Sequence, residues 1–229
     1  MTAATRMGIG SAMATALAGL VAAIVSVTTP PRSGPFCTAG CVTYPYTDVV
    51  AFAPRDYWWL YPQSLFVLLG LALIVCVHTA AAPSVRTFSG IAVALAGVSA
   101  TALLADYVTQ LTVVLPSLHR GETAGLSLLS QYNPHGIFVG LENLGYLLLG
   151  LALLVVAAAF TAPNRLERGL RRVLLAGGTL TVVALPSLAL RYGSDLEYRF
   201  EVAAITLTWI TLIAAGVLLT RWFGSGTDK

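Results

Sequence analysis

Charged residues are scarce in this chain: only 10% of its 229 residues are Asp, Glu, Lys or Arg. Soluble domains carry about 25%, so an ordinary water-exposed surface is excluded. Hydrophobic residues make up 57% of the chain, and the mean hydropathy is +0.80. This composition is typical of a membrane protein, and we expect the lipid bilayer to be its main partner.

The sequence also lacks the short motifs of common enzyme classes. It contains no G-x-G-x-x-G, Walker A, H-E-x-x-H, C-x-x-C or G-x-S-x-G pattern. Nucleotide binding, zinc proteolysis, thioredoxin-like redox chemistry and serine hydrolysis therefore have no support. The net charge of +3 gives no indication of nucleic-acid binding. We predict no cofactor and no metal site.

Six apolar runs of about 20 residues are each long enough to cross a bilayer as an α-helix. They lie near residues 8 to 29, 61 to 82, 89 to 115, 137 to 161, 170 to 190 and 201 to 222. The predicted fold is therefore all-α, with one polytopic transmembrane domain over residues 1 to 229. The first run exceeds the roughly 7 to 15 apolar residues of a signal peptide, which favours a retained span, and cleavage would leave five spans.

The basic residues predict how these spans are oriented. With both termini in the cytoplasm, eight of the thirteen basic residues collect on the inner side: Arg6, Arg86, Arg165, Arg168, Arg171, Arg172, Arg221 and Lys229. This distribution obeys the positive-inside rule. The longer loops, 30 to 60, 116 to 133 and 191 to 200, then face outside. We expect a multi-pass protein of the cell membrane.

The outer loop 30 to 60 carries two cysteines and an aromatic block. Cys37 and Cys41 lie four residues apart on an oxidising face, which predicts a local disulfide, because two thiols alone make a poor metal site. Tyr and Trp residues at this boundary are typical of an interfacial belt. In the alternative interpretation, Asp56, Tyr57 and Tyr61 form the lid of an outward-facing cavity.

Two carboxyl groups fall inside apolar spans. Asn133 and Pro134 are a good helix start, and a helix beginning near Pro134 places Glu142 roughly 12 Å into the membrane. Asp106 reaches a similar depth in the preceding antiparallel span, so we expect both acids to face one chamber. Acidic residues inside a membrane are costly and mark functional sites. Glu201 is placed near the outer boundary, either in water or paired with an arginine.

The segment around Glu142 resembles a known sequence box. The pattern Q-Y-N-P-H-G-I-F at 131 to 138, followed by L-E-x-L-G-Y at 141 to 146, resembles bacterial multi-pass membrane proteins without an assigned function. The patterns D-Y-x-x-Q at 106 to 110 and P-R-D-Y at 54 to 57 resemble parts of the same group. In size and general character, the chain also resembles the small membrane-embedded cyclases of meroterpenoid biosynthesis, which are helical bundles with buried acids and aromatic walls.

These residues predict an enzyme for a lipophilic substrate, most concretely a protonation-initiated isoprenoid cyclase. Asp106 or Glu142 would donate the proton to an alkene or epoxide. The side chains expected to orient that acid are Tyr107, Gln110 and Asn143. Aromatic rings stabilise cations through their quadrupole. The rings placed to do so are Phe138, Tyr146, Tyr57 and Trp58.

Two other functions would use the same polar residues. In a proton-coupled transporter or sensor, the acids would bind a proton or a cation, although six spans without a visible internal repeat count against it. In a non-catalytic accessory protein, the polar groups would be interhelical hydrogen bonds. Such bonds average only about 0.6 kcal/mol, which explains two carboxyl groups poorly.

Overall fold

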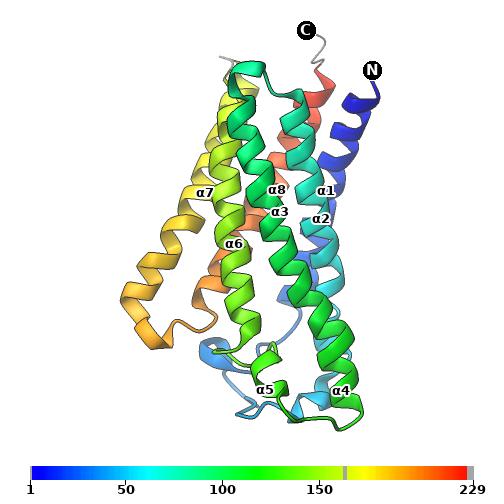
Figure 1. Ribbon diagram of the computed structural model, residues 1–229, viewed down its shortest axis with the longest axis vertical. Coiled ribbons are helices and arrows are strands. Elements are labelled where there is room, and N and C mark those ends of the chain that lie inside the picture. The colour runs from blue at the N-terminus through cyan, green and yellow to red at the C-terminus, as the bar shows by residue number, and fades with distance from the viewer. Residues whose placement is uncertain (1, 162–163, 226–229) are drawn as a thin grey trace.

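The computed structural model describes residues 2 to 161 and 164 to 225, and every regular element in these ranges is a helix. Six of them are long and apolar enough to cross a membrane. The long helices in Figure 1 are α1 (Ala3–Val27), α2 (Leu60–Ala80), α3 (Arg86–Thr109), α6 (Ile137–Val156), α7 (Arg165–Tyr192) and α8 (Arg199–Gly224). The prediction of an all-α bundle with six membrane-spanning helices is confirmed.

Short helical segments shape the connections between the long helices. Single 3-10 turns occupy Gly34–Phe36, Asp48–Phe52, Arg55–Tyr57, Pro83–Val85, Ala157–Ala159 and Gly193–Asp195. Helix α3 continues through a π-helical segment, Gln110–Val114, into α4 (Leu115–His119), and α5 (Leu126–Leu129) follows in the next loop. A disulfide joins Cys37 and Cys41 in the first long loop.

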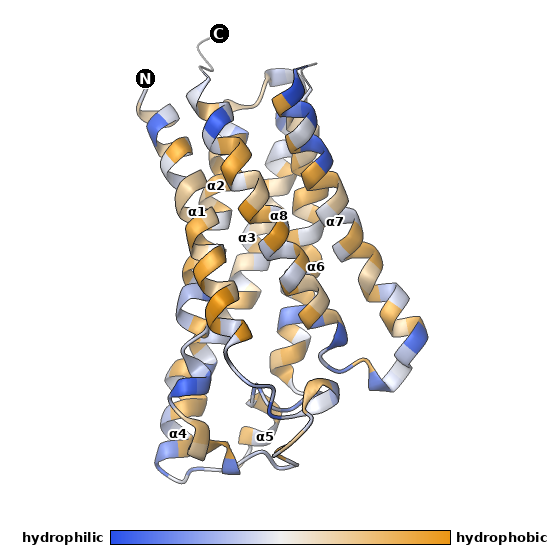
Figure 2. Ribbon diagram, turned by 180° about the vertical axis from the view of Figure 1, so that it is seen from behind, coloured by the Kyte–Doolittle hydropathy of each residue, from blue (hydrophilic) through white to orange (hydrophobic). Residues whose placement is uncertain are grey.

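The six long helices form a closed ring. Each packs against the next in the order α1, α2, α3, α6, α7 and α8, and α8 packs back against α1. Figure 1 shows both termini at one end of the bundle, and the long loops with α4 and α5 at the opposite end, which we call the loop end. Hydrophobic residues dominate the middle of the helices, with hydrophilic residues gathered at both ends (Figure 2). This distribution matches a bundle set across a bilayer.

Helix α6 begins later than the sequence predicted. The start near Pro134 is wrong, because the helix begins at Ile137. The Asn133 side chain instead accepts from the His135 amide at 2.9 Å, so it closes a separate turn before the helix. Glu142 consequently lies about 7.5 Å along the helix axis from its first residue, nearer the loop end than expected.

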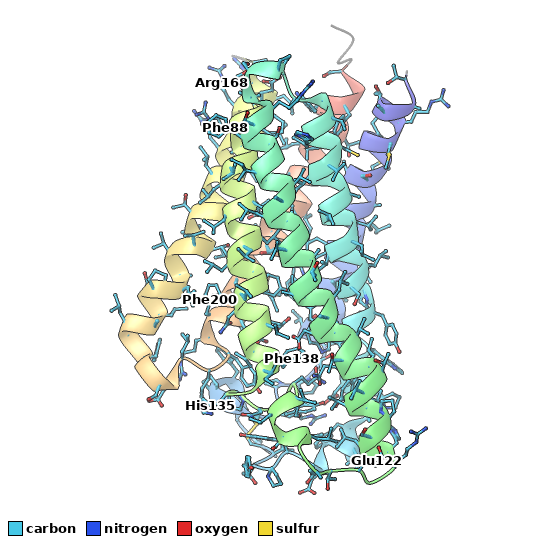
Figure 3. The ribbon with its side chains drawn as sticks, viewed as in Figure 1. Phe88, Glu122, His135, Phe138, Arg168 and Phe200 are labelled. Atoms are coloured by element: carbon cyan, nitrogen blue, oxygen red, sulfur yellow. A yellow bond between two sulfur atoms is a disulfide. The ribbon has the colours of Figure 1, made fainter. Side chains whose placement is uncertain are left out.

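Aromatic side chains fill the bundle near the loop end. Phe138 of α6 and Phe200 of α8 are almost completely buried there (Figure 3). Toward the other end, small residues bring helix backbones together. A Cβ atom added to Gly178 of α7 would lie 2.7 Å from the Gly150 carbonyl oxygen and 2.9 Å from the Leu154 amide nitrogen of α6. Small residues at interfaces permit such close approach in membranes.

This contact predicts a stability change that can be measured directly. We expect Gly178→Ala to lower stability by about 1 to 3 kcal/mol, because the added methyl group meets backbone atoms that cannot rotate away. Gly140→Ala on α6 is the matched control, since a Cβ there meets nothing within 4 Å. Thermal unfolding in detergent measures both. An equal midpoint for the two variants would contradict the tight contact between α6 and α7.

Candidate functional site

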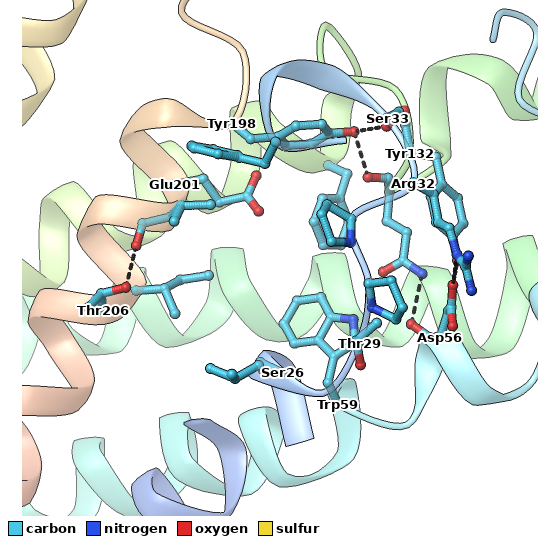
Figure 4. Close-up of a pocket in the computed structure, with 18 of the residues that line it drawn as sticks. Ser26, Thr29, Arg32, Ser33, Asp56, Trp59, Tyr132, Tyr198, Glu201 and Thr206 are labelled. Atoms are coloured by element: carbon cyan, nitrogen blue, oxygen red, sulfur yellow. Dashed lines mark hydrogen bonds and ion pairs between the residues drawn. The ribbon is translucent and has the colours of Figure 1, made fainter. Parts of the chain in front are cut away.

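A cavity of about 390 Å³ lies at the loop end of the bundle (Figure 4). Its wall is formed by the end of α1 and the chain that follows it, by Asp56 and Trp59, by Gln131, Tyr132 and Phe138, and by the first turns of α8. Apolar and aromatic side chains make up much of the wall: Val27, Pro30, Pro31, Phe36, Trp59, Tyr132, Phe138, Val202, Ile205 and Trp209. The volume lies in the range of small-molecule pockets, roughly 300 to 1,000 Å³.

Glu201 brings a carboxyl group to this wall. It lies in the first turn of α8, is buried, and points into the cavity in Figure 4. The prediction that Glu201 is in water or paired with an arginine is wrong. The nearby Arg199 forms its ion pair with Glu197, at 3.3 Å. The position of Glu201 in the sequence indicated its depth, whereas the side of α8 that faces the cavity follows from packing.

Two further acids lie behind Glu201. Glu142 of α6 is fully buried, and its carboxyl group is close enough to that of Glu201 for a direct interaction. Asp106 of α3 is within electrostatic reach of both. Among the described residues, the Oε2 atoms of Glu142 and Glu201 and the Oδ2 atom of Asp106 have no hydrogen-bond partner. The structure thus brings Asp106 and Glu142 together, but the wall of the cavity contains neither of them.

A chain of buried hydrogen bonds ends at Glu142. Trp209 Nε1 donates to Gln63 Oε1 at 3.0 Å, and Gln63 Nε2 donates to the Tyr146 hydroxyl at 2.7 Å. The hydroxyl groups of Tyr146 and Tyr107 lie 2.8 Å apart, and Tyr107 donates to Glu142 Oε1 at 2.7 Å. Because the Tyr107 hydroxyl has a single proton and donates it to Glu142, the Tyr146 hydroxyl must be the donor in its bond to Tyr107. Every donor in the chain therefore points toward Glu142.

The chain connects four helices and returns to the cavity. Its members come from α2, α3, α6 and α8, and its first member, Trp209, lines the cavity together with Glu201. Hydrogen bonds that share one direction polarise each other, and such a network favours one arrangement of the side chains that it joins. Glu142 is consequently held in a fixed position beside Glu201. Two neighbouring buried carboxyl groups can share a single proton.

A second set of hydrogen bonds fastens the loops over the cavity. Ser33 Oγ donates to the Tyr132 carbonyl at 2.6 Å, and the Tyr198 hydroxyl donates to the Gln131 carbonyl at 3.0 Å. Arg32 pairs with Asp56 at 2.8 Å. Burial raises the pKa of Tyr132 and Tyr198 above the usual value for tyrosine, so both hydroxyl groups remain protonated near neutral pH. The first long loop and the segment 131 to 133 therefore form one cover.

Two residues predicted to orient the acid have other surroundings. Gln110 donates to the Leu129 carbonyl at 2.5 Å and accepts from the Gln131 amide at 3.1 Å, so it supports the cover. The Oδ1 atom of Asn143 is buried without a hydrogen-bond partner among the described residues. Of the predicted orienting residues, Tyr107 is the one that bonds to Glu142.

The predicted aromatic residues are only partly in the cavity wall. Phe138 lines it, and Tyr146 belongs to the hydrogen-bond chain behind it. Tyr57 is buried outside the wall, and Trp58 is 57% exposed, as in an interfacial belt. The neighbouring Trp59 faces the cavity instead.

The wall also contains rings that sequence reasoning missed, among them Trp209. The spacing of residues in α8 could have predicted that Trp209 lies on the same side as Glu201. Glu201, Ile205 and Trp209 lie four residues apart and share one helix face.

The described residues contain no group of three or more His, Cys, Asp or Glu side chains that could hold a metal ion. Comparison with known proteins found no matching family model, no matching curated protein and no matching solved structure. The sequence resemblances therefore stay predictions, and function is argued from the cavity and the acids beside it.

Proposed function

We propose that this protein is a membrane-embedded enzyme that acts on a lipophilic substrate by acid catalysis, most concretely a protonation-initiated isoprenoid cyclase. One observation carries the proposal: the Glu201 carboxyl group lies in the wall of a largely apolar and aromatic cavity, with a second buried carboxyl group, that of Glu142, as its neighbour. Intramembrane acids are functional sites by default. An apolar pocket with few converging polar groups is the usual form of a ligand site.

In the proposed reaction, Glu201 gives its proton to an alkene carbon or an epoxide oxygen of the substrate. The resulting carbocation is attacked by the electron pair of another alkene in the same chain, which forms a carbon–carbon bond and closes a ring. The final cation loses a proton to the Glu201 carboxylate, which restores the acid. Glu142, held by Tyr107, positions the Glu201 carboxyl group and shares its proton between turnovers. The net reaction is an isomerisation that needs no co-reactant.

The rings in the wall suit a cationic intermediate. Trp59 and Phe138 lie edge to face, with centroids 6.3 Å apart, and Trp209 lines the cavity two helical turns from Glu201. A cation within about 6 Å of an aromatic face is stabilised by about 0.5 to 2 kcal/mol or more once desolvated. Such rings do not react with the cation as water would.

The position of the acids favours an enzyme over a transporter. The buried charged side chains among the described residues are Asp56, Asp106, Glu142 and Glu201, and all belong to the half of the bundle at the loop end. Secondary transporters hold their substrate and coupling-ion sites near the bilayer midplane, at the interface of repeated halves. Toward the termini, the buried polar residues are serines and threonines instead. An accessory protein, in turn, has no need of a cavity beside its acids.

The proposal is tested by incubating the purified protein with prenylated phenols and their terminal epoxides, followed by mass-resolved chromatography. We expect a product of unchanged mass and altered retention from at least one of these substrates. A folded protein that converts none of them would contradict the cyclase assignment. Proton-dependent uptake of the same compounds into sealed vesicles, without conversion, would identify a transporter instead.

Tyr107 provides a test of the positioning role of Glu142. We expect Tyr107→Phe to lower kcat by roughly 10-fold to 100-fold, because a hydrogen bond to a charged group contributes about 1.5 to 3 kcal/mol. KM should change little, since Tyr107 does not line the cavity. Tyr44→Phe in the exposed outer loop is the control. A variant with unchanged kcat and raised KM would assign Tyr107 to substrate binding instead.

A further inference from the structure

The cavity opens on the side of the bundle, between the end of α1 and the first turns of α8. Six residues of its wall also lie on the outer surface: Val202 and Thr206 of α8, Val27 at the end of α1, and Pro30, Pro31 and Phe36 in the chain that follows α1. The exposed fraction of Val27 is 82%, and that of Val202 is 43%. Because both helices are membrane-spanning, this surface faces lipid. The opening therefore connects the cavity with the leaflet next to the loop end.

The packing of α1 against α8 explains this opening. Near the termini the two helices touch, since a Cβ atom added to Gly216 would lie 2.7 Å from the Ala12 carbonyl oxygen. At the loop end, α1 finishes at Val27 and the chain turns through Pro30 and Pro31, while α8 continues to Arg199. The cavity lies where α1 ends beside the first turns of α8. Ser26, Val27, Val202 and Thr206 line the cavity at this place.

The charges around the cavity restrict the ligand that it can hold. Arg32 is the one basic residue in the described wall, and its charge is matched by Asp56 at 2.8 Å. Glu201 adds a carboxyl group to the wall, with Glu142 and Asp106 behind it. An entering phosphate or diphosphate would meet these acids with no unpaired cation to balance it, and unpaired buried charges are strongly disfavoured. The cavity suits an uncharged or cationic ligand.

From these observations we infer that a single-chain membrane lipophile without a phosphate group enters the cavity laterally, between α1 and α8. A volume of about 390 Å³ is small for a ligand pocket and suits one isoprenoid chain, not the two acyl chains of a phospholipid. The chain enters from the leaflet, and its reactive end comes to rest beside Glu201. This inference builds on the proposed function for the role of Glu201, but binding and entry can be measured without turnover.

A photoreactive farnesol carrying a diazirine and an alkyne is a suitable probe for the full-length protein in phosphatidylcholine vesicles. After irradiation, labelled peptides are identified by mass spectrometry. We expect labelling concentrated on the opening, at Val27, Val202 and Thr206, at least 5-fold above the exposed Val108 of α3. An excess of farnesol should remove it, whereas farnesyl diphosphate should compete at least 10-fold less well.

A matched pair of variants on α8 tests the route itself. Thr206→Trp fills the opening, whereas Ile210→Trp places the same ring one turn further along α8, at a residue that is 63% exposed and outside the cavity wall. We expect Thr206→Trp to lower labelling at least 5-fold and Ile210→Trp to leave it unchanged. A thermal midpoint equal to the wild type shows that either variant is folded.

Three results would overturn the inference: labelling spread evenly over all exposed helices, displacement by the diphosphate as effective as by farnesol, or undiminished labelling of a folded Thr206→Trp variant. Failure of the proposed reaction gives a different pattern. Labelling at the opening without any cyclised product would contradict the cyclase and leave the entry route intact. Formation of a cyclised product with labelling away from the opening would contradict the entry route and leave the proposed reaction intact.

Discussion

Glu201→Gln is expected to lower turnover by a factor of roughly 10² to 10⁴, the usual contribution of a positioned general acid. The amide keeps the size and most of the shape of the side chain, but it has no acidic proton to donate. The reaction is most sensitive at this position because Glu201 is the member of the acid group that faces the cavity. Substrate affinity should change much less than kcat.

Glu122→Gln provides the matched control for this variant. Glu122 lies in an exposed loop at the far loop end (Figure 3), and its substitution makes the same chemical change outside the cavity. We expect the control to retain wild-type turnover in the same product assay. Full activity of a folded Glu201→Gln variant would contradict the assignment of Glu201 as the acid. Glu142→Gln and Asp106→Asn would then identify which buried acid donates the proton.

Gln63→Leu is expected to produce the largest loss of stability among single substitutions in the hydrogen-bond chain, roughly 2 to 5 kcal/mol. Gln63 is fully buried in α2, where it accepts from Trp209 and donates to Tyr146. Leucine has a similar volume but leaves the indole N–H without an acceptor and the Tyr146 hydroxyl without a donor. Each buried polar group without a partner costs about 1 to 3 kcal/mol.

A double-mutant cycle with Trp209→Phe separates this effect from general packing. In the Trp209→Phe background there is no indole N–H, so Gln63→Leu leaves only the Tyr146 hydroxyl without its partner. The double variant should therefore lose less stability than the sum of the losses in the two single variants. We expect a coupling of about 1 kcal/mol, within the range for contacting residues. Interhelical hydrogen bonds in membranes average about 0.6 kcal/mol, and purely additive losses would show that the Trp209–Gln63 bond contributes nothing.

The sequence was sufficient to predict the six long helices because the signal for each one lies within its own stretch of the chain. An uninterrupted apolar run of about 20 residues predicts a membrane helix whatever its neighbours are. The expectation that Asp106 and Glu142 come together followed from the antiparallel order of α3 and α6, and the structure has both acids in one group. The start of α6 was misplaced because Asn133 caps a preceding turn, a use of Asn-Pro that looks the same in sequence.

The cavity itself was beyond reach of sequence reasoning because its wall comes from distant parts of the chain. It needs α1 beside α8, the first and last spans, and no pattern in either indicates that they meet. Single residues were missed for a related reason. Trp58 and Trp59 are adjacent in the helical turn before α2, about 100° apart, so one side chain is exposed and the other lines the cavity. The packing of α2 determines which of the two side chains faces the cavity.

The central claim is that Glu201 and the surrounding rings stabilise a cation inside an apolar cavity. The most direct measurement compares the binding of geranyltrimethylammonium with that of its uncharged tert-butyl isostere. Binding is followed by the quenching of tryptophan fluorescence, to which Trp59 and Trp209 of the cavity wall contribute. Analogues of a transition state bind roughly 10² to 10⁸ times more tightly than substrates, so we expect the ammonium compound to bind at least 10-fold more tightly than the isostere. That preference should fall in Glu201→Gln to the smaller part that the aromatic rings supply. Equal affinity of the wild-type protein for both compounds would contradict the account.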